Sequence, residues 1–250
     1  MITGMITLTL PTVLRLVAWR GGEPHTALAD TPAWRDPAVL AEVDERAAAE
    51  LAEWGLPGSA ELEDLLDALV LPRAECYGWI TTTDRDRRID YRVLAVAGER
   101  AAFVLTVADE LVTIVPVRAS GLVAEVVARL PGHPPARGRA LNAPRADVDR
   151  IVSGVGPAGG DLGAMAEILR QPRVGGGSLY SAVRPRARGR RRVPRPVVYV
   201  DTPGGRWLTG VTTNPGQAEW VTVAPAGPGL LATRLEELHR DLTGQAMGVR

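Results

Sequence analysis

Apolar residues recur at helical spacing in two segments of this chain that resemble each other. Residues 61–73 read ELEDLLDALVLPR and residues 161–173 read DLGAMAEILRQPR, so both begin with an acidic residue and continue with apolar residues about one turn apart. Each segment runs into a proline, which lacks an N–H and clashes with the preceding turn. Both segments therefore predict amphipathic helices that end at the proline.

Alternating runs of β-branched and aromatic residues follow each of these helices. In the first half they occupy residues 77–83, 91–98, 100–107 and 111–117, and in the second half residues 178–184, 196–205, 206–212 and 220–226. Such runs predict strands, and the glycine turns between several of them are typical of hairpins. Each half then closes with a further predicted helix, over 121–130 and 229–242.

The order of helix, four strands and helix therefore occurs twice. The two proline-terminated helices align without a gap at Leu62 and Leu162, Leu69 and Leu169, Pro72 and Pro172, and Arg73 and Arg173. We predict one domain over residues 1–250, with internal repeats 37–131 and 145–243 joined by a Pro-, Gly- and Arg-rich linker at 132–144. Two such halves would share one central antiparallel sheet flanked by helices, so the predicted fold class is α+β with pseudo-twofold symmetry.

Further segments lie outside the unit of helix, four strands and helix. Residues 37–54 and 146–155 predict a helix before each half, and residues 12–19 alternate in a way that predicts an additional strand. The segment 184–196, RPRARGRRRVPRP, predicts a solvated low-complexity turn between two strands.

Composition and charge narrow the class of protein. The chain has 250 residues and 46% hydrophobic content, enough for a sizeable core. Residues 1–135 carry 12 arginines against 20 acidic residues, whereas residues 136–250 carry 17 against 9, and this dipole could steer an elongated partner. The single cysteine excludes an intramolecular disulfide, and the apolar start lacks the basic region of a signal peptide. A cytoplasmic protein without membrane insertion is predicted.

Residues that carry chemistry do not form a catalytic or metal-binding pattern. There is no GxSxG motif, Cys76 follows Glu75, and the glycines at 175–177 precede a strand instead of opening a phosphate-binding helix. The other residues that could take part in catalysis or metal binding are predicted to be isolated surface or helix-cap residues. They are His25, His133, His239, and the acidic pairs Asp84/Asp86 and Asp147/Asp149. We predict no enzymatic activity, no metal and no cofactor.

Two features suggest binding instead. The arginine-rich segment 184–195 could contact phosphates, so a nucleic-acid or regulatory binding module is the alternative function, although the neutral chain offers no stacking platform beside the arginines. Aromatic residues on the predicted strands could anchor a protein partner or fill the core, namely Trp79, Tyr180, Tyr199, Trp207 and Trp220. Tyr180 and Trp207 stand out because Leu179 and Leu208 already supply the opposite-facing apolar residue.

Three segments resemble a known family. In order and spacing, QPRVGGGSLYSAVR, RPRPVVYVDTPGGRWL and WVTVAPAGPGLLATRLEEL are similar to the C-terminal half of EspG proteins, and the first half fits more loosely. The resemblance implies an actinobacterial cytosolic chaperone of type VII (ESX) secretion that binds the helical tip of PPE proteins in PE-PPE heterodimers. It also implies an EspG-like sheet flanked by helical bundles, with no requirement for ATP or metal.

On this reading, the apolar tip of a PE-PPE-like heterodimer, or of another helical-hairpin substrate, is buried against the sheet and the C-terminal helical bundle. No nucleic acid is expected as a partner, and an open sheet face would allow a weak homodimer. Contact residues follow no fixed family motif, so the predicted partner-binding residues rest on strand position and chemistry. They are Tyr180, Ala182 and Arg184 on one strand, Tyr199 and Asp201 on the next, and Trp207 on the third.

Overall fold

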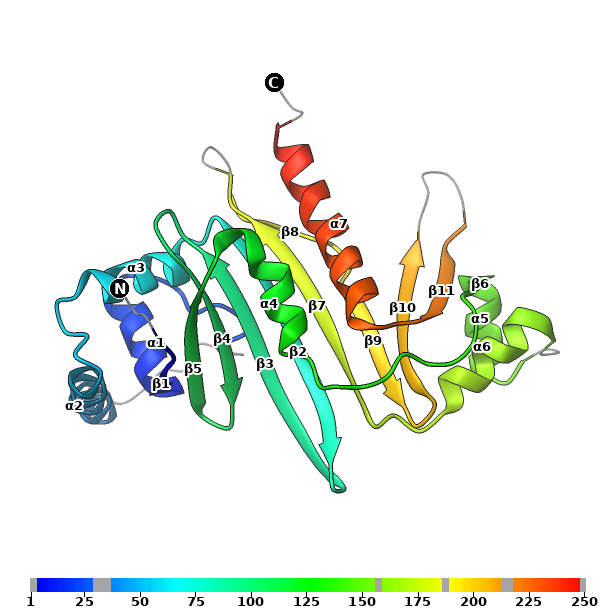
Figure 1. Ribbon diagram of the computed structural model, residues 1–250, viewed down its shortest axis with the longest axis horizontal. Coiled ribbons are helices and arrows are strands. Elements are labelled where there is room, and N and C mark those ends of the chain that lie inside the picture. The colour runs from blue at the N-terminus through cyan, green and yellow to red at the C-terminus, as the bar shows by residue number, and fades with distance from the viewer. Residues whose placement is uncertain (1–3, 29–36, 156–158, 186–188, 213–217, 248–250) are drawn as a thin grey trace.

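A computed structural model describes residues 4–28, 37–155, 159–185, 189–212 and 218–247 (Figure 1). The strands are β1 (Ile6–Thr9), β2 (Ala74–Asp84), β3 (Arg87–Ala97), β4 (Ala102–Ala108), β5 (Leu111–Val117), β6 (Leu141–Pro144), β7 (Gly175–Val183), β8 (Arg191–Arg192), β9 (Val197–Thr202), β10 (Gly205–Thr212) and β11 (Trp220–Pro225). The helices are α1 (Leu10–Trp19), α2 (Pro37–Glu53), α3 (Ala60–Val70), α4 (Leu122–Ala128), α5 (Arg145–Val152), α6 (Gly160–Arg170) and α7 (Pro228–Met247), with a short 3-10 turn at Ala119–Gly121.

All of these strands belong to one antiparallel sheet. Its order is β1-β5-β4-β3-β2-β7-β9-β10-β11-β6, and β8 pairs with β7 beside this path. Read from the centre outward, the order in the first half, β2, β3, β4, β5, β1, is matched in the second by β7, β9, β10, β11, β6. The two halves meet in the β2–β7 ladder, where Tyr77 lies opposite Tyr180. The predicted α+β fold with a pseudo-twofold sheet is confirmed, whereas the exact repeat boundaries stay a prediction.

Helices cover the two faces of this sheet differently. Because side chains alternate along a strand, Cys76 and Ile80 of β2 point to one face, where they share a core with α4 and α7. Tyr77 points to the other face and joins a core formed with α1 and α3. In the second half this other face packs Trp207 of β10 and Val223 of β11 against Met165 of α6.

The centre of that second face is consequently left without a helix. Figure 1 shows α1, α2 and α3 gathered at one end of the sheet and α5 and α6 at the other, while α4 and α7 cross the central strands. The helix-free stretch lies over β2, β7 and β9. No helix of the described residues is long and apolar enough to cross a membrane.

Local sequence explains where α3 begins and ends. The Ser59 side chain accepts a hydrogen bond from the Leu62 amide at 3.2 Å and caps the helix, and Glu61 and Glu63 lie in the first turn, where carboxylates favour the helix dipole. Its leucines are buried, and the helix ends two residues before Pro72. The prediction from residues 61–73 is therefore confirmed.

The strand predicted for residues 12–19 is wrong, because these residues belong to helix α1. Thr9 caps the helix by accepting a hydrogen bond from the Thr12 amide, and Pro11 lies in the first turn, where its missing N–H costs nothing. The buried residues of this helix are Thr12, Val13, Leu16 and Val17. Their spacing is that of one face of a helix, although the alternation of apolar and polar residues suggested a strand.

The predicted linker at 132–144 is also more ordered than expected. Its last residues form β6, an edge strand paired with β11. Earlier in the segment, the amide of Arg206 donates to the carbonyl of Pro134 at 2.8 Å, and the amide of Ala136 donates to the carbonyl of Arg206 at 3.1 Å. The segment between the halves is therefore bound to the sheet along much of its length.

Candidate functional site

The helix-free centre of the sheet contains a groove with a volume of about 460 Å³. Its floor comes from three neighbouring strands, with Trp79 and Thr81 on β2, the glycines 175–177 on β7, and Val198 and Val200 on β9. Arg88 of β3 and Arg173, which precedes β7, lie at its rim. The lining is thus mixed: Trp79, Val198 and Val200 are apolar, Thr81, Thr83 and Ser178 carry hydroxyl groups, and the two arginines add positive charge.

The glycine run brings the floor strands close together. A Cβ on Gly176 would lie 2.9 Å from the carbonyl oxygen of Tyr199, and one on Gly177 would lie 2.7 Å from the Tyr199 ring. Either substitution would push β7 and β9 apart. The glycines, which were predicted to precede a strand, instead form the first residues of β7 and allow the backbones of β7 and β9 to approach closely.

Helix α6 forms one wall of a hollow that adjoins the groove. This hollow shares Arg173 and Val200 with the groove and is also lined by Ile168, Leu169 and Gln171 from the end of α6, and by Trp207 and Thr209 of β10. The hollow therefore lies between the groove and helix α6.

Three aromatic rings pack together beside the groove, and one of them, Trp79, belongs to the groove lining. Tyr77 and Tyr180 are stacked, with centroids 5.4 Å apart and planes at 12°, and Trp79 stands edge-on to both at 5.7 Å. Tyr77 is fully buried, whereas Trp79 and Tyr180 are half-buried and reach the surface. Half-buried aromatics held by their neighbours are the side chains that most often anchor protein partners.

Two arginines from the arginine-rich segment lie over the tyrosines. The Arg190 guanidinium is 5.6 Å from the centre of the Tyr77 ring, and the Arg192 guanidinium is 5.3 Å from that of Tyr180. At these distances a cation is attracted by the face of the ring. The prediction that this segment is a solvated turn is wrong for Arg190, whose side chain is only 30% exposed.

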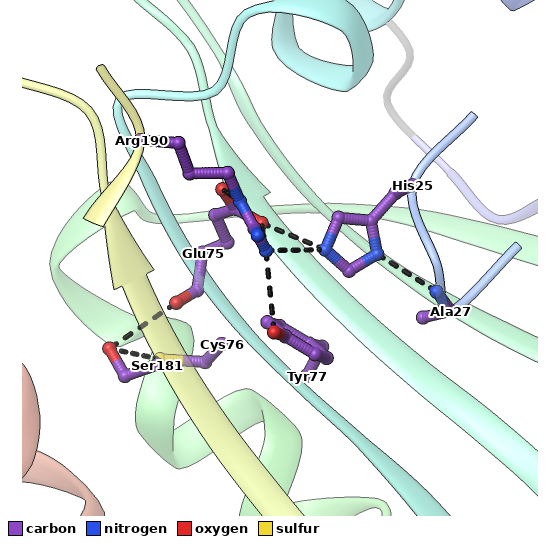
Figure 2. A network of polar contacts seen from close by, with 7 residues as sticks. All are labelled: His25, Ala27, Glu75, Cys76, Tyr77, Ser181 and Arg190. Atoms are coloured by element: carbon purple, nitrogen blue, oxygen red, sulfur yellow. Dashed lines mark hydrogen bonds and ion pairs between the residues drawn. The ribbon is translucent and has the colours of Figure 1, made fainter. Parts of the chain in front are cut away.

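Arg190 is held by a buried carboxylate, as Figure 2 shows. Glu75 of β2 is completely buried and accepts hydrogen bonds from Arg190 Nε at 2.7 Å and Nη2 at 2.9 Å. The same Nη2 lies 3.3 Å from the hydroxyl of Tyr77. Burial alone would raise the pKa of Glu75, but the hydrogen bonds from His25 and Arg190 outweigh it and lower this pKa to about 2.

His25 completes the network from the segment after α1. Its Nδ1 accepts a hydrogen bond from the Ala27 amide at 3.0 Å, which places the ring proton on Nε2, and Nε2 lies 2.9 Å from Glu75 Oε2. Arg190 Nη2 is also 3.1 Å from this protonated nitrogen, so that contact is a close approach of two donors. The prediction that His25 is an isolated surface residue is wrong.

The other two histidines are not isolated either. Nε2 of His133 lies 2.9 Å from the carbonyl oxygen of Thr202, and Nδ1 of His239 lies 2.7 Å from the hydroxyl of Ser181. Burial lowers the pKa of His239. Both therefore make specific contacts with the second half of the sheet.

Potential nucleophiles in the same region are inaccessible. Cys76 and Ser181 are completely buried, and burial is the main cause that raises the pKa of the Cys76 thiol to about 12. A thiol with that pKa is protonated at neutral pH and unreactive. Within the described residues, no three His, Cys, Asp or Glu side chains come together in a way that could hold a metal ion.

The structure separates the six predicted partner-binding residues. Tyr180 contacts Trp79 of the groove lining but is not itself part of that lining. Ala182 is buried opposite Glu75, and Tyr199 and Asp201 point to the face covered by α4 and α7. Trp207 is 6% exposed beneath α6, and Arg184 lines a different pocket beside α3. Burial contradicts a surface role for Ala182, Tyr199, Asp201 and Trp207, while partner binding by the others stays a prediction.

The burial of Asp201 is explained by an ion pair with Arg206. Its carboxylate accepts hydrogen bonds from Arg206 Nε at 2.7 Å and Nη2 at 2.8 Å, and both side chains are at most 3% exposed. Arg206 Nη2 also donates to the carbonyl of Pro131 at 2.9 Å, and its guanidinium lies 4.3 Å from the centre of the Tyr199 ring. This pair fixes the segment between the halves to the sheet.

Sequence reasoning missed the groove residues on β2 and β9. In the sequence, Trp79 is one of several strand aromatics, and no local pattern distinguishes Thr81, Val198 or Val200. The available signal was the pairing itself: Thr81 lies opposite Gly176, and Gly176 lies opposite Val200, so these residues must share a face.

Comparison with known proteins agrees with this fold. The sequence model of the EspG family matches residues 14–237. The structure is similar to that of the Mycobacterium tuberculosis type VII secretion system chaperone EspG5 in complex with the PE25-PPE41 dimer, with a TM-score of 0.69 and 15% sequence identity over 94% of this chain and 95% of that chain. At this identity the likeness shows the fold. No curated protein matches the chain significantly.

Proposed function

The chain belongs to the EspG family, and from this premise we propose that it is a cytosolic, non-catalytic specificity chaperone of a type VII secretion system. Its client would be a helical secretion substrate, either a PE-PPE-like heterodimer or an analogous helical hairpin. The chaperone would cover the apolar tip of that client and keep it soluble until secretion.

The groove on the open face of the sheet is the observation that carries this proposal. An α-helix with its side chains is about 10–12 Å across, so a groove of about 460 Å³ accommodates a few apolar side chains instead of a whole helix. The end of a helical hairpin, with its apolar side chains gathered at the tip, fits this shape. Val198, Val200 and Trp79 would contact the apolar tip.

Charges at the border of the groove would contribute selectivity. Arg88 and Arg173 are exposed at the rim, and Arg88 donates to Asp90 at 2.8 Å. Rim charges mainly control the rate of association and exclude wrong partners. We therefore expect the preferred client to carry acidic residues next to its apolar tip.

The arginine-rich segment does not favour the alternative function of nucleic-acid binding. Arg190 is bound to Glu75, Arg192 lies over Tyr180, and Arg195 is paired with Glu219. Contacts to phosphates would require these arginines to leave their present partners. The proposed chaperone function uses the segment as it is folded.

Co-expression tests the proposal directly. The chain would be produced with each PE-PPE-like gene pair of its own genome, and light scattering after size-exclusion chromatography would give the mass of the complex. We expect one pair to form a stoichiometric complex, and Ser178→Arg, which places a long charged side chain at the groove lining, to abolish it.

The matched control is Thr212→Arg, because Thr212 is an exposed β10 residue outside the groove lining. That variant should bind as the unmodified chain does. Failure of every pair to bind, or equal binding by the Ser178→Arg variant, would contradict the proposed function.

A further inference from the structure

The carboxylate at the centre of the network in Figure 2 is buried, and the proposed function does not use it. Glu75 occupies an inward-facing position of β2, two residues before Tyr77, and none of it is exposed. Burying a carboxylate is costly unless it is paired and hydrogen-bonded. Here both partners come from irregular segments, His25 from the stretch after α1 and Arg190 from the stretch before β8.

A need for stability does not by itself explain a buried ion pair at these positions. Replacing a buried ion pair by packed hydrophobic residues is often neutral or stabilising, so a buried pair is weak evidence for stability. What such a pair can supply is one defined geometry. The contacts that begin at Glu75 continue, residue by residue, toward the groove.

Contacts from Glu75 to the groove form an unbroken chain. Arg190, held by two hydrogen bonds to Glu75, donates toward the hydroxyl of Tyr77 at 3.3 Å and lies over its ring. The His25 ring stands edge-on to the same tyrosine at 4.5 Å. Tyr77 in turn stacks on Tyr180, and both contact Trp79.

We propose that Glu75 is a positioning residue which, through Arg190 and His25, braces Tyr77 and so fixes Tyr180 and Trp79 in the orientation that the groove presents to its client. The inference rests on the proposed function for the identity of that client. On this proposal, the arginine-rich segment helps to shape a protein-binding surface. Glu75 itself touches no client.

Replacing Arg190 by lysine distinguishes a role in bracing Tyr77 from a role in stabilising the fold. In an Arg190→Lys variant the ammonium can still pair with Glu75, so the buried charge stays compensated and the melting temperature should be unchanged. Lysine lacks the planar fork that binds a carboxylate at two points while stacking on a ring. Tyr77 would therefore lose its brace without loss of the fold.

The chain has 4 tyrosines, Tyr77, Tyr91, Tyr180 and Tyr199, so ¹³C-labelled tyrosine gives a readable NMR spectrum of the rings. In Arg190→Lys we expect the Tyr77 and Tyr180 signals to shift and those of Tyr91 and Tyr199 to stay in place. Arg195→Lys is the matched control, since Arg195 belongs to the same segment but pairs with Glu219. It should shift neither Tyr77 nor Tyr180.

Client affinity is the second readout, measured with the PE-PPE-like pair that forms a complex with the unmodified chain. We expect Arg190→Lys to bind about tenfold more weakly, the equivalent of about 1.4 kcal/mol, and Arg195→Lys to bind normally. Unchanged Tyr77 and Tyr180 signals would overturn the proposal, as would shifted signals with unchanged affinity. An unmodified chain that binds no such pair would overturn the proposed function instead, and the tyrosine spectra would still decide whether Arg190 braces the rings.

Discussion

Tyr77 and Tyr180 stack across the ladder where the two halves of the sheet meet, with ring planes only 12° apart. They occupy directly opposite positions on neighbouring antiparallel strands, so the sheet register itself brings the rings together. One ring is completely buried and the other is half-buried. The pair therefore connects the interior of the N-terminal half to the open surface at the centre of the molecule.

Trp79 should act as an anchor for the client. Its side chain is half-buried at the groove, and truncation of such an aromatic anchor typically costs 2 kcal/mol or more of binding free energy, about 30-fold in affinity. Trp220→Ala is the matched control, because Trp220 is 45% exposed on β11 and lies outside the groove lining. Calorimetric titration with the client should show the loss for Trp79→Ala alone, and equal losses in both variants would refute the assignment.

Trp207 should behave as a core residue. It is 6% exposed and packs with Met165 and Val223 under helices α5 and α6. Truncation of a buried tryptophan leaves a cavity and costs about 3–5 kcal/mol. Urea unfolding of Trp207→Ala should show a loss of this size, and a variant as stable as the unmodified chain would show that the ring is not part of the core.

Asp201 should also be needed for stability. In Asp201→Asn the Arg206 guanidinium stays buried with a neutral partner, and breaking a buried ion pair in this way costs about 3–5 kcal/mol. Arg139, whose pair with Asp161 is exposed, provides the contrast, because solvent screens this pair and Arg139→Gln should change the stability little. Thermal unfolding of the two variants would contradict the assignment if their losses were equal.

Cys76 should be unreactive while the chain is folded. Its thiol has a pKa of about 12 and no exposed surface, so a thiol-specific reagent needs the protein to unfold first. Labelling at neutral pH should rise from almost none in buffer to one thiol per chain in denaturant. Rapid labelling in buffer would mean that the β2–β7 ladder opens readily.

Patterns local in sequence predicted most elements of the fold. Helix α3 and strand β2, for example, follow from a capped run of leucines and from alternation. Alternation failed at residues 12–19, where the cap at Thr9 and Pro11 in the first turn were the better signals of a helix.

The candidate site was harder to predict because it depends on which face of the sheet the helices cover. Tyr180 and Tyr199 lie on neighbouring strands but point to opposite faces, so helices α4 and α7 bury Tyr199 and leave Tyr180 half-buried beside Trp79. The network around Glu75 joins residues 115 positions apart, beyond any local pattern. The one sequence signal was an acidic residue at an inward position of an apolar strand.

The pairing of Glu75 should make stability depend on pH below neutrality. Its pKa is lowered from the ordinary 4.5 to about 2, so the stabilisation is complete above pH 4.5 and is lost as the pH falls toward 2. The size of this contribution is on the order of 3 kcal/mol.

Protonated glutamic acid resembles glutamine, so the difference in unfolding free energy between the unmodified chain and Glu75→Gln should shrink across this window. Glu99→Gln, which removes an exposed partner of Arg73, is the control and should show a small difference at every pH. A difference for Glu75→Gln that stays constant from pH 7 to pH 2.5 would mean that the pKa of Glu75 is the same in the folded and the unfolded chain, and that its pairing gives no pH-dependent stabilisation.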